Sequence, residues 1–103
     1  MKYYDNINDI KVGDVLKNII TNDVYVILKV DSCEDRYYED RYYTQLYYIT
    51  DMEYEMMKNR KTIDLLDIDY DIICGDEMVV SDYKLIDHYN INYKQIITFN
   101  EVN

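Results

Sequence analysis

Residues 13–30 read GDVLKNIITNDVYVILKV, and this stretch decides the fold. Two strand-like runs, 13–17 and 24–30, flank a polar turn around Thr21-Asn22-Asp23, which predicts a β-hairpin. Side chains of the second run alternate between two faces of a strand. We expect the core to lie on the face that carries Val24, Val26, Leu28 and Val30, with Tyr25, Ile27 and Lys29 opposite.

The rest of the chain contains further strand patterns and one helix pattern. Alternation predicts strands at 42–50, 62–73, 78–80 and 93–99, whereas the charged segment 31–41 predicts an exposed loop or a projecting hairpin. Residues 51–60 favour a helix, because Asp51 can cap it and Lys58 and Arg60 suit its carboxyl end. The alternative there is a strand that ends in a turn at Asn59-Arg60. Residues 83–89 predict a helical turn or irregular structure.

Composition agrees with a β protein. Ile, Val, Tyr and Thr far outnumber Leu, and Ala is absent; β-branched and aromatic side chains suit a pleated surface. A length of 103 residues without an internal linker predicts a single domain, 1–103. The sequence therefore predicts a mainly β fold, with α+β as the alternative.

The order Gly-Asp-Val-Leu, turn, Val-Tyr-Val-Ile-Leu-Lys-Val resembles the opening hairpin of small SH3-like barrels. The resemblance covers about 20 residues. It implies a small curled antiparallel sheet or an SH3-like partly open barrel with one or two short helices.

The charge balance excludes one class of partner. With 21 acidic and 11 basic residues the formal net charge is −10, so direct binding of nucleic acid through a basic surface is not expected. The sequence has no secretory h-region and no apolar stretch of membrane-spanning length. We therefore expect a cytoplasmic protein that does not contact membranes, with Cys33 and Cys74 as free thiols. A single disulfide between these two cysteines is the alternative.

No motif in the chain predicts catalysis or cofactor binding. Asp67, Asp69 and Asp71 have the spacing that opens a calcium-binding loop, but Ile72 and Met78 replace the Gly and Glu that such a loop requires. His88 is the only histidine, and no Gly-rich loop is present to bind phosphate. We expect no enzyme activity, no metal and no cofactor.

Acidic residues dominate the segment between Thr62 and Tyr83, which contains no base. Carboxylates on one strand face recur about every 6.6–7 Å, close to the separation of successive phosphates along a nucleic-acid strand. Such a row can mimic nucleic acid, although ordinary solubility of an acidic protein is the alternative explanation. The candidate binding residues here are Asp64, Asp67, Asp69, Asp71, Asp76 and Glu77.

Tyrosines form a second candidate surface. The chain has 14 of them, and tyrosine is enriched in protein-binding surfaces. An acidic aromatic patch would suit an Arg-rich partner; alternatively, one tyrosine of each adjacent pair faces the core. The candidate residues are Tyr37, Tyr38, Tyr42, Tyr43, Tyr47 and Tyr48, together with Glu34, Asp35, Glu39 and Asp40.

The small size, the negative charge and the abundance of residues with A/T-rich codons resemble the small acidic anti-defence proteins of phages and mobile elements, including anti-CRISPR proteins. The resemblance implies a non-enzymatic inhibitor that presents its acidic, Tyr-rich surface to a basic nucleic-acid-binding host protein, such as a defence nuclease, in the host cytoplasm. The alternative is a structural or regulatory interaction module of a phage or bacterium, with a Tyr-rich homodimer or scaffold interface.

Overall fold

The computed structural model describes residues 6–34, 42–59, 70–74 and 78–91, and the backbone alone of 2–3, 63–64 and 96–97. The side chain of Cys33 is not included. The elements are β1 (Lys2–Tyr3), η1 (Ile7–Asp9), β2 (Asp14–Asn18), β3 (Val24–Glu34), β4 (Tyr42–Thr50), α1 (Asp51–Met57), β5 (Ile63–Asp64), β6 (Asp71–Cys74), η3 (Val80–Asp82), β7 (Tyr83–His88) and β8 (Ile96–Ile97).

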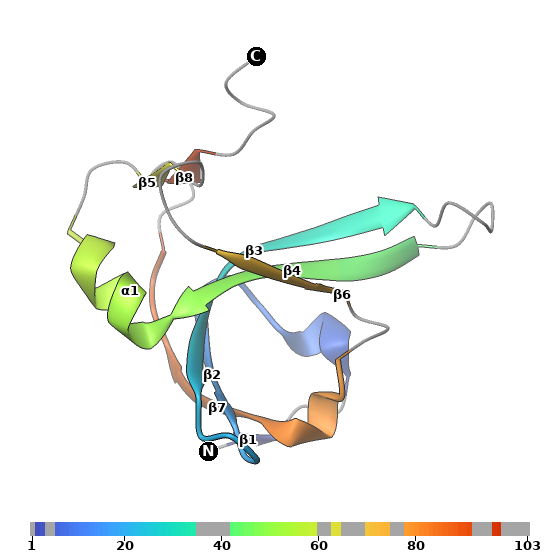
Figure 1. Ribbon diagram of the computed structural model, residues 1–103. Helices are drawn as coiled ribbons and strands as arrows, with labels where there is room; N and C mark the ends of the chain where they lie inside the picture. The colour runs from blue at the N-terminus through green and yellow to red at the C-terminus, as the bar shows by residue number, and fades with distance from the viewer. Residues whose placement is uncertain are drawn as a thin grey trace.

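An antiparallel sheet forms the body of the protein (Figure 1). Its strand order is β1-β7-β2-β3-β4-β6, and β5 and β8 form a separate parallel pair. The mainly β, antiparallel prediction is confirmed, whereas the strong curl expected of an SH3-like barrel is wrong: the described sheet is open. Its edge strands β1 and β6 have only two and four residues, so they offer little backbone for closing a barrel.

The predicted hairpin of residues 13–30 is present as β2 and β3, with Val15 opposite Val26. β3 continues to Glu34 and pairs with β4 as far as Tyr42, so the two strands extend together beyond the rest of the sheet (Figure 1). Residues 31–34 are therefore strand, in agreement with the projecting-hairpin alternative. The remainder of the predicted loop, 35–41, lies outside the described residues.

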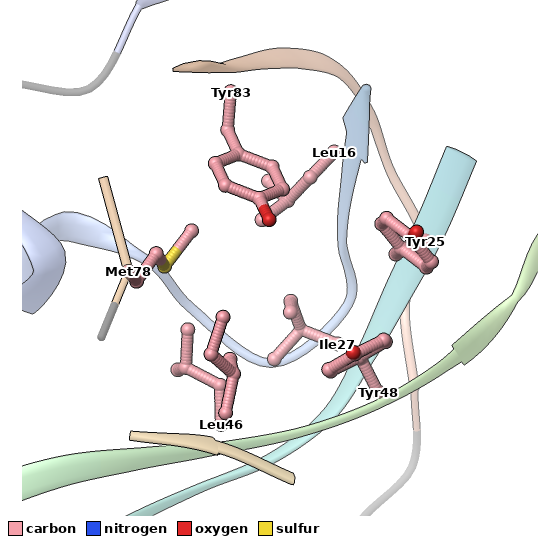
Figure 2. A pocket seen from close by; sticks show the side chains of 8 residues that line it. Leu16, Tyr25, Ile27, Leu46, Tyr48, Met78 and Tyr83 are labelled. Carbon is pink, nitrogen blue, oxygen red and sulfur yellow. The ribbon is translucent and has the colours of Figure 1, made fainter. Parts of the chain in front are cut away.

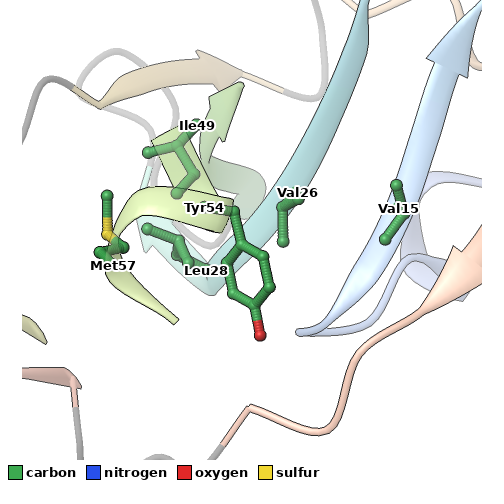
Figure 3. Close-up of a cluster of buried hydrophobic side chains, with 6 residues drawn as sticks. All are labelled: Val15, Val26, Leu28, Ile49, Tyr54 and Met57. Carbon is green, nitrogen blue, oxygen red and sulfur yellow. The ribbon is translucent and has the colours of Figure 1, made fainter. Parts of the chain in front are cut away.

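The sheet buries apolar side chains on both faces. On the face covered by α1, Val15, Val26, Leu28 and Ile49 pack with Tyr54 and Met57 of the helix (Figure 3). On the other face, the core cluster consists of Ile10, Leu16, Ile27, Leu46 and Met78. The prediction that only the Val24 face of residues 24–30 is core is therefore incomplete, because Ile27 is also fully buried.

A register shift in β3 alters its side-chain alternation. In β3, Ile27 lies opposite Tyr48 and Lys29 lies opposite Tyr47, so Leu28 is an extra residue. An extra residue moves the side chains beyond it to the other face. Val30 accordingly packs against the core cluster that contains Leu46. The alternation had predicted that Val30 shares the face of Val26, and this prediction is wrong.

Helix α1 begins one residue away from the predicted cap. Thr50, not Asp51, is the N-cap: its side chain accepts a hydrogen bond from the Glu53 N–H at 3.2 Å, and the Glu53 carboxylate accepts one from the Thr50 N–H. This capping box fixes the helix start. The predicted helix is confirmed over Asp51–Met57, and Asp51 lies at its first position.

The structure bears on four predictions from the second half of the chain. Residues 83–88 form the strand β7, which contains a bulge at Ile86, so the helical turn or irregular structure predicted over 83–89 is wrong. Residues 80–82 form a 3₁₀ turn, so the strand predicted over 78–80 is also wrong. The single strand predicted over 62–73 is wrong, because β5 and β6 belong to different sheets and Tyr70 before β6 is not strand. Within the strand predicted over 93–99, β8 is described and the other residues lie outside the description.

Candidate functional site

The sheet face opposite α1 presents tyrosines from three strands and is called here the aromatic face. Tyr25 of β3 and Tyr48 of β4 meet edge to face, with ring centroids 4.8 Å apart. Tyr83 of β7 reaches the same region from the other side (Figure 2). Tyr25 is further held by a hydrogen bond from its hydroxyl to the Asp23 carboxylate at 3.3 Å.

These three tyrosines line a small pocket, called here the tyrosine pocket (Figure 2). Its other lining residues are apolar: Leu16, Ile27, Leu46, Ile73 and Met78. The pocket volume is about 10 Å³, which is about the minimum that holds one water molecule. It is therefore too small for a cofactor or a nucleotide.

A larger and more polar concavity adjoins the tyrosine pocket and shares Tyr25 with it. This acidic hollow has a volume of about 530 Å³ and is lined by Asn22, Asp23, Val24, Tyr25, Thr50, Asp51, Met52 and Asp71. Three of these residues are aspartates, and none is a base. The hollow therefore favours a cationic occupant over an anionic one.

Local sequence explains how the carboxylates reach the hollow. The Asn18 side chain accepts hydrogen bonds from the Ile20 and Thr21 N–H groups, which shapes the turn before Asp23. Asp51 stands beside this turn because Thr50 takes the N-cap position, and its carboxylate accepts a hydrogen bond from the Tyr89 hydroxyl at 3.4 Å. Asp71, at the start of β6, lies directly across from Tyr48.

The aspartates and the burial of the rings keep the site phenols neutral. Burial raises the pKa of Tyr25 to about 12, with further contributions from Asp23, Tyr48 and Tyr83. Burial also raises the pKa of Tyr48, and the Asp71 charge adds to this effect. Both hydroxyls therefore stay protonated, and can donate hydrogen bonds, throughout the physiological pH range.

Alkaline titration tests this environment. Because the pKa of Tyr25 in the folded protein lies above its ordinary value of 10.0, the proton on Tyr25 stabilises the fold below pH 10, and this stabilisation is lost as the pH rises toward 12. Phenolate absorbance should show a late component with a pKa of about 12. Tyr25→Phe should reduce this component and the exposed control Tyr42→Phe should leave it unchanged; an undiminished component in Tyr25→Phe would contradict the assignment.

The structure brings together several residues of the two predicted surfaces. Asp71, from the acidic segment, lies opposite Tyr48, and Glu34 lies opposite Tyr42, which is 64% exposed. Because alternate residues of β4 share a face, Tyr42 and Tyr48 belong to the aromatic face. Asp71 of the acidic segment and part of the tyrosine patch thus lie on one side of the sheet.

Two other predicted tyrosines lie on the opposite face of the sheet. Tyr47 packs near Tyr70, with ring centroids 5.6 Å apart, and the Lys29 ammonium lies 5.3 Å from the Tyr47 centroid. Tyr43 alternates with Tyr42 and so shares the face of Tyr47. The tyrosines at 42, 43, 47 and 48 are therefore divided between the two faces of the sheet.

The remaining predicted site residues cannot be placed on either face. Only the backbone of Asp64 is described. The others lie outside the described residues: Asp35, Tyr37, Tyr38, Glu39, Asp40, Asp67, Asp69, Asp76 and Glu77.

Sequence reasoning missed four residues of the site: Asp23, Tyr25, Asp51 and Tyr83. They come from a turn, a helix start and two strands. Alternation placed Tyr25 and Ile27 on one face, which was a partial signal. The pairing of β2 with β7, which brings Tyr83 beside them, has no local signature.

A second polar cluster lies at the Gly13 end of the sheet. The Asp14 carboxylate is buried; its Oδ1 lies 2.8 Å from His88 Nδ1, and its Oδ2 accepts a hydrogen bond from the Lys11 N–H at 2.9 Å. The described residues place no serine or cysteine nucleophile in hydrogen-bond contact with His88. This pair therefore supplies the base and orienting carboxylate of a triad without its nucleophile, and we interpret it as a link between β2 and β7.

Other site classes find no support in the described part of the chain. Those residues contain no group of three or more His, Cys, Asp or Glu side chains placed to bind a metal ion. No helix among them is long and apolar enough to span a membrane. Comparisons of the chain with protein-family models, with curated proteins and with solved structures found no match. The functional argument therefore rests on the geometry of the aromatic face.

Proposed function

We propose that the protein is a non-enzymatic inhibitor that binds a basic, nucleic-acid-binding host protein through its acidic aromatic face. The observation that supports this best is the acidic hollow, where Asp23, Asp51 and Asp71 surround an open concavity with no base among its lining residues. The tyrosine pocket beside it supplies aromatic contact area, which is typical of protein-binding surfaces.

Electrostatics favour a partner that ordinarily binds nucleic acid. A net charge of −10 on 103 residues attracts a positively charged channel over distances of about 8–10 Å at ordinary salt. Association would be fast and salt-sensitive. By filling the channel, the protein would exclude the nucleic acid stoichiometrically, which is the mode of action that its resemblance to anti-defence proteins implies.

Retention on the tagged full-length protein tests this proposal. A lysate of a low-GC bacterium that contains its native nucleases would be treated with nuclease and passed over the protein at two salt concentrations. We expect retention of a basic nucleic-acid-binding protein, which is released by high salt and by its own nucleic acid. Release by nucleic acid is the decisive readout, because it shows competition for one surface.

A structural or regulatory module that self-associates is the second candidate. It is favoured by the position of β6 at the edge of the sheet that the described residues form, where Ile72 is 46% exposed, since an edge strand can pair with another chain. This reading predicts a salt-resistant homodimer, or retention of phage structural proteins. If only these species are recovered, and no nucleic-acid-binding protein, the inhibitor proposal is wrong.

A further inference from the structure

The tyrosine pocket and the acidic hollow together define what kind of group can occupy the aromatic face. They share Tyr25, so an occupant of one lies beside the other. The pocket is apolar and aromatic, and its volume is only about 10 Å³. The hollow offers about 530 Å³ of open space beside three carboxylates. A suitable ligand therefore has an apolar part next to a positive charge.

The lining of the hollow bears on the kind of positive group that suits it. The described acidic side chains form no group of three or more that could hold a metal ion, so a larger organic cation is favoured over a metal ion. A guanidinium group is larger and planar and has five N–H donors.

We propose that the aromatic face receives an arginine side chain of the basic partner, with its guanidinium in the acidic hollow near Asp23 and Asp71 and its aliphatic stem against Tyr25. This inference rests on the proposed function and names the chemical group that the partner supplies. Arginine is favoured over lysine because its guanidinium is more weakly hydrated, stacks on aromatic rings and pairs with carboxylates in a bidentate manner.

The receiving surface is held in place before binding. The Tyr25 hydroxyl donates to Asp23 at 3.3 Å, and the ring contacts Tyr48 edge to face. Asp71 is fixed across from Tyr48 by strand pairing. Because the rings and one carboxylate are already positioned, binding orders few additional side chains on this protein, and less affinity is lost to entropy.

Methionine methyl NMR of the full-length protein provides a site-specific test. Met52 lines the hollow, whereas Met56, on the same helix and similarly exposed at 80% against 78%, does not. Oligoarginine and oligolysine peptides of equal length serve as probes. We expect oligoarginine to shift the Met52 methyl signal more than that of Met56, and to bind roughly threefold to tenfold more tightly than oligolysine.

Two variants and a matched control test the named residues. Asp71→Lys should weaken oligoarginine binding about tenfold, whereas Asp9→Lys, which makes the same charge change at an exposed site in η1, should have a much smaller effect. Tyr25→Leu should abolish the preference for arginine over lysine. The methyl spectrum of each variant shows whether it is folded, and Asp23→Asn can replace any variant that is not.

The outcomes separate this inference from the proposed function. Equal effects of Asp71→Lys and Asp9→Lys, or equal shifts at Met52 and Met56, would overturn the arginine site, because binding would then reflect net charge alone. Retention of a nucleic-acid-binding protein would leave the proposed function standing in that case. Conversely, site-specific oligoarginine binding with no such protein retained would support the arginine site and overturn the inhibitor proposal.

Discussion

Gly13→Ala is expected to lower the free energy of unfolding by about 3 kcal/mol or more. Gly13 has φ +93°, a conformation that side-chain-bearing residues rarely adopt. A Cβ atom there would also collide with the backbone carbonyl oxygen of Tyr89. The backbone strain and the steric collision both destabilise the folded state, because rotating a side chain relieves neither of them.

The backbone around Gly13 has little freedom to relieve the collision. The Gly13 N–H donates to the Ile27 carbonyl at 2.8 Å, and the Tyr89 N–H donates to the Gly13 carbonyl at 2.7 Å. Moving either chain segment would break one of these bonds. Urea unfolding followed by circular dichroism measures the effect, with the exposed Ser81→Ala as a control of nearly zero change; an unchanged midpoint for Gly13→Ala would contradict the expected strain.

Local patterns were sufficient to predict the elements whose signals lie within a few residues. The hairpin of 13–30 has a turn between two alternating runs, and Asn22 adopts a positive φ of 64° in that turn, as asparagine tolerates. The helix after Thr50 was predicted from its charges. Its cap was misplaced by one residue because Thr50 and Asp51 are both good cap residues, and only the contact of Thr50 with Glu53 distinguishes them.

The strand β7 was missed because a bulge interrupts its alternation. Leu16 lies opposite Leu85 while Val15 lies opposite Asp87, so Ile86 is an extra residue. Tyr83 and Leu85 pack against the core on one face, and the pattern then changes. Since a register shift arises from the partner strand, reading residues 83–89 alone cannot detect it.

The candidate site was predicted only in part, because its composition also depends on contacts between elements that are distant in the sequence. Asp71 and Tyr48 were expected to bind a partner, and β4–β6 pairing places them opposite each other. Asp23, Asp51 and Tyr83 join them only through the sheet and through the position of α1. Composition thus indicated an acidic aromatic surface, while tertiary structure decided which acids and which tyrosines share a face.

Asp14→Ala is expected to lower the free energy of unfolding by about 3 kcal/mol. The Asp14 carboxylate is nearly inaccessible, and it contacts His88 Nδ1 and the Lys11 N–H. Asp14 and His88 are 74 positions apart and lie opposite each other in the β2–β7 ladder. Removing the carboxylate therefore leaves two polar groups without this partner and weakens the junction between the two strands.

Comparison with His88→Ala distinguishes a structural link from a loss of charge alone. If Asp14 joins β2 to β7 through His88, the double variant should lose less stability than the sum of the two single variants. Asp87→Asn, a change at an exposed neighbour, should have little effect. Urea unfolding of the unmodified protein and the four variants measures these values; strictly additive losses would show that Asp14 stabilises the turn at Lys11 and not the pairing of the strands.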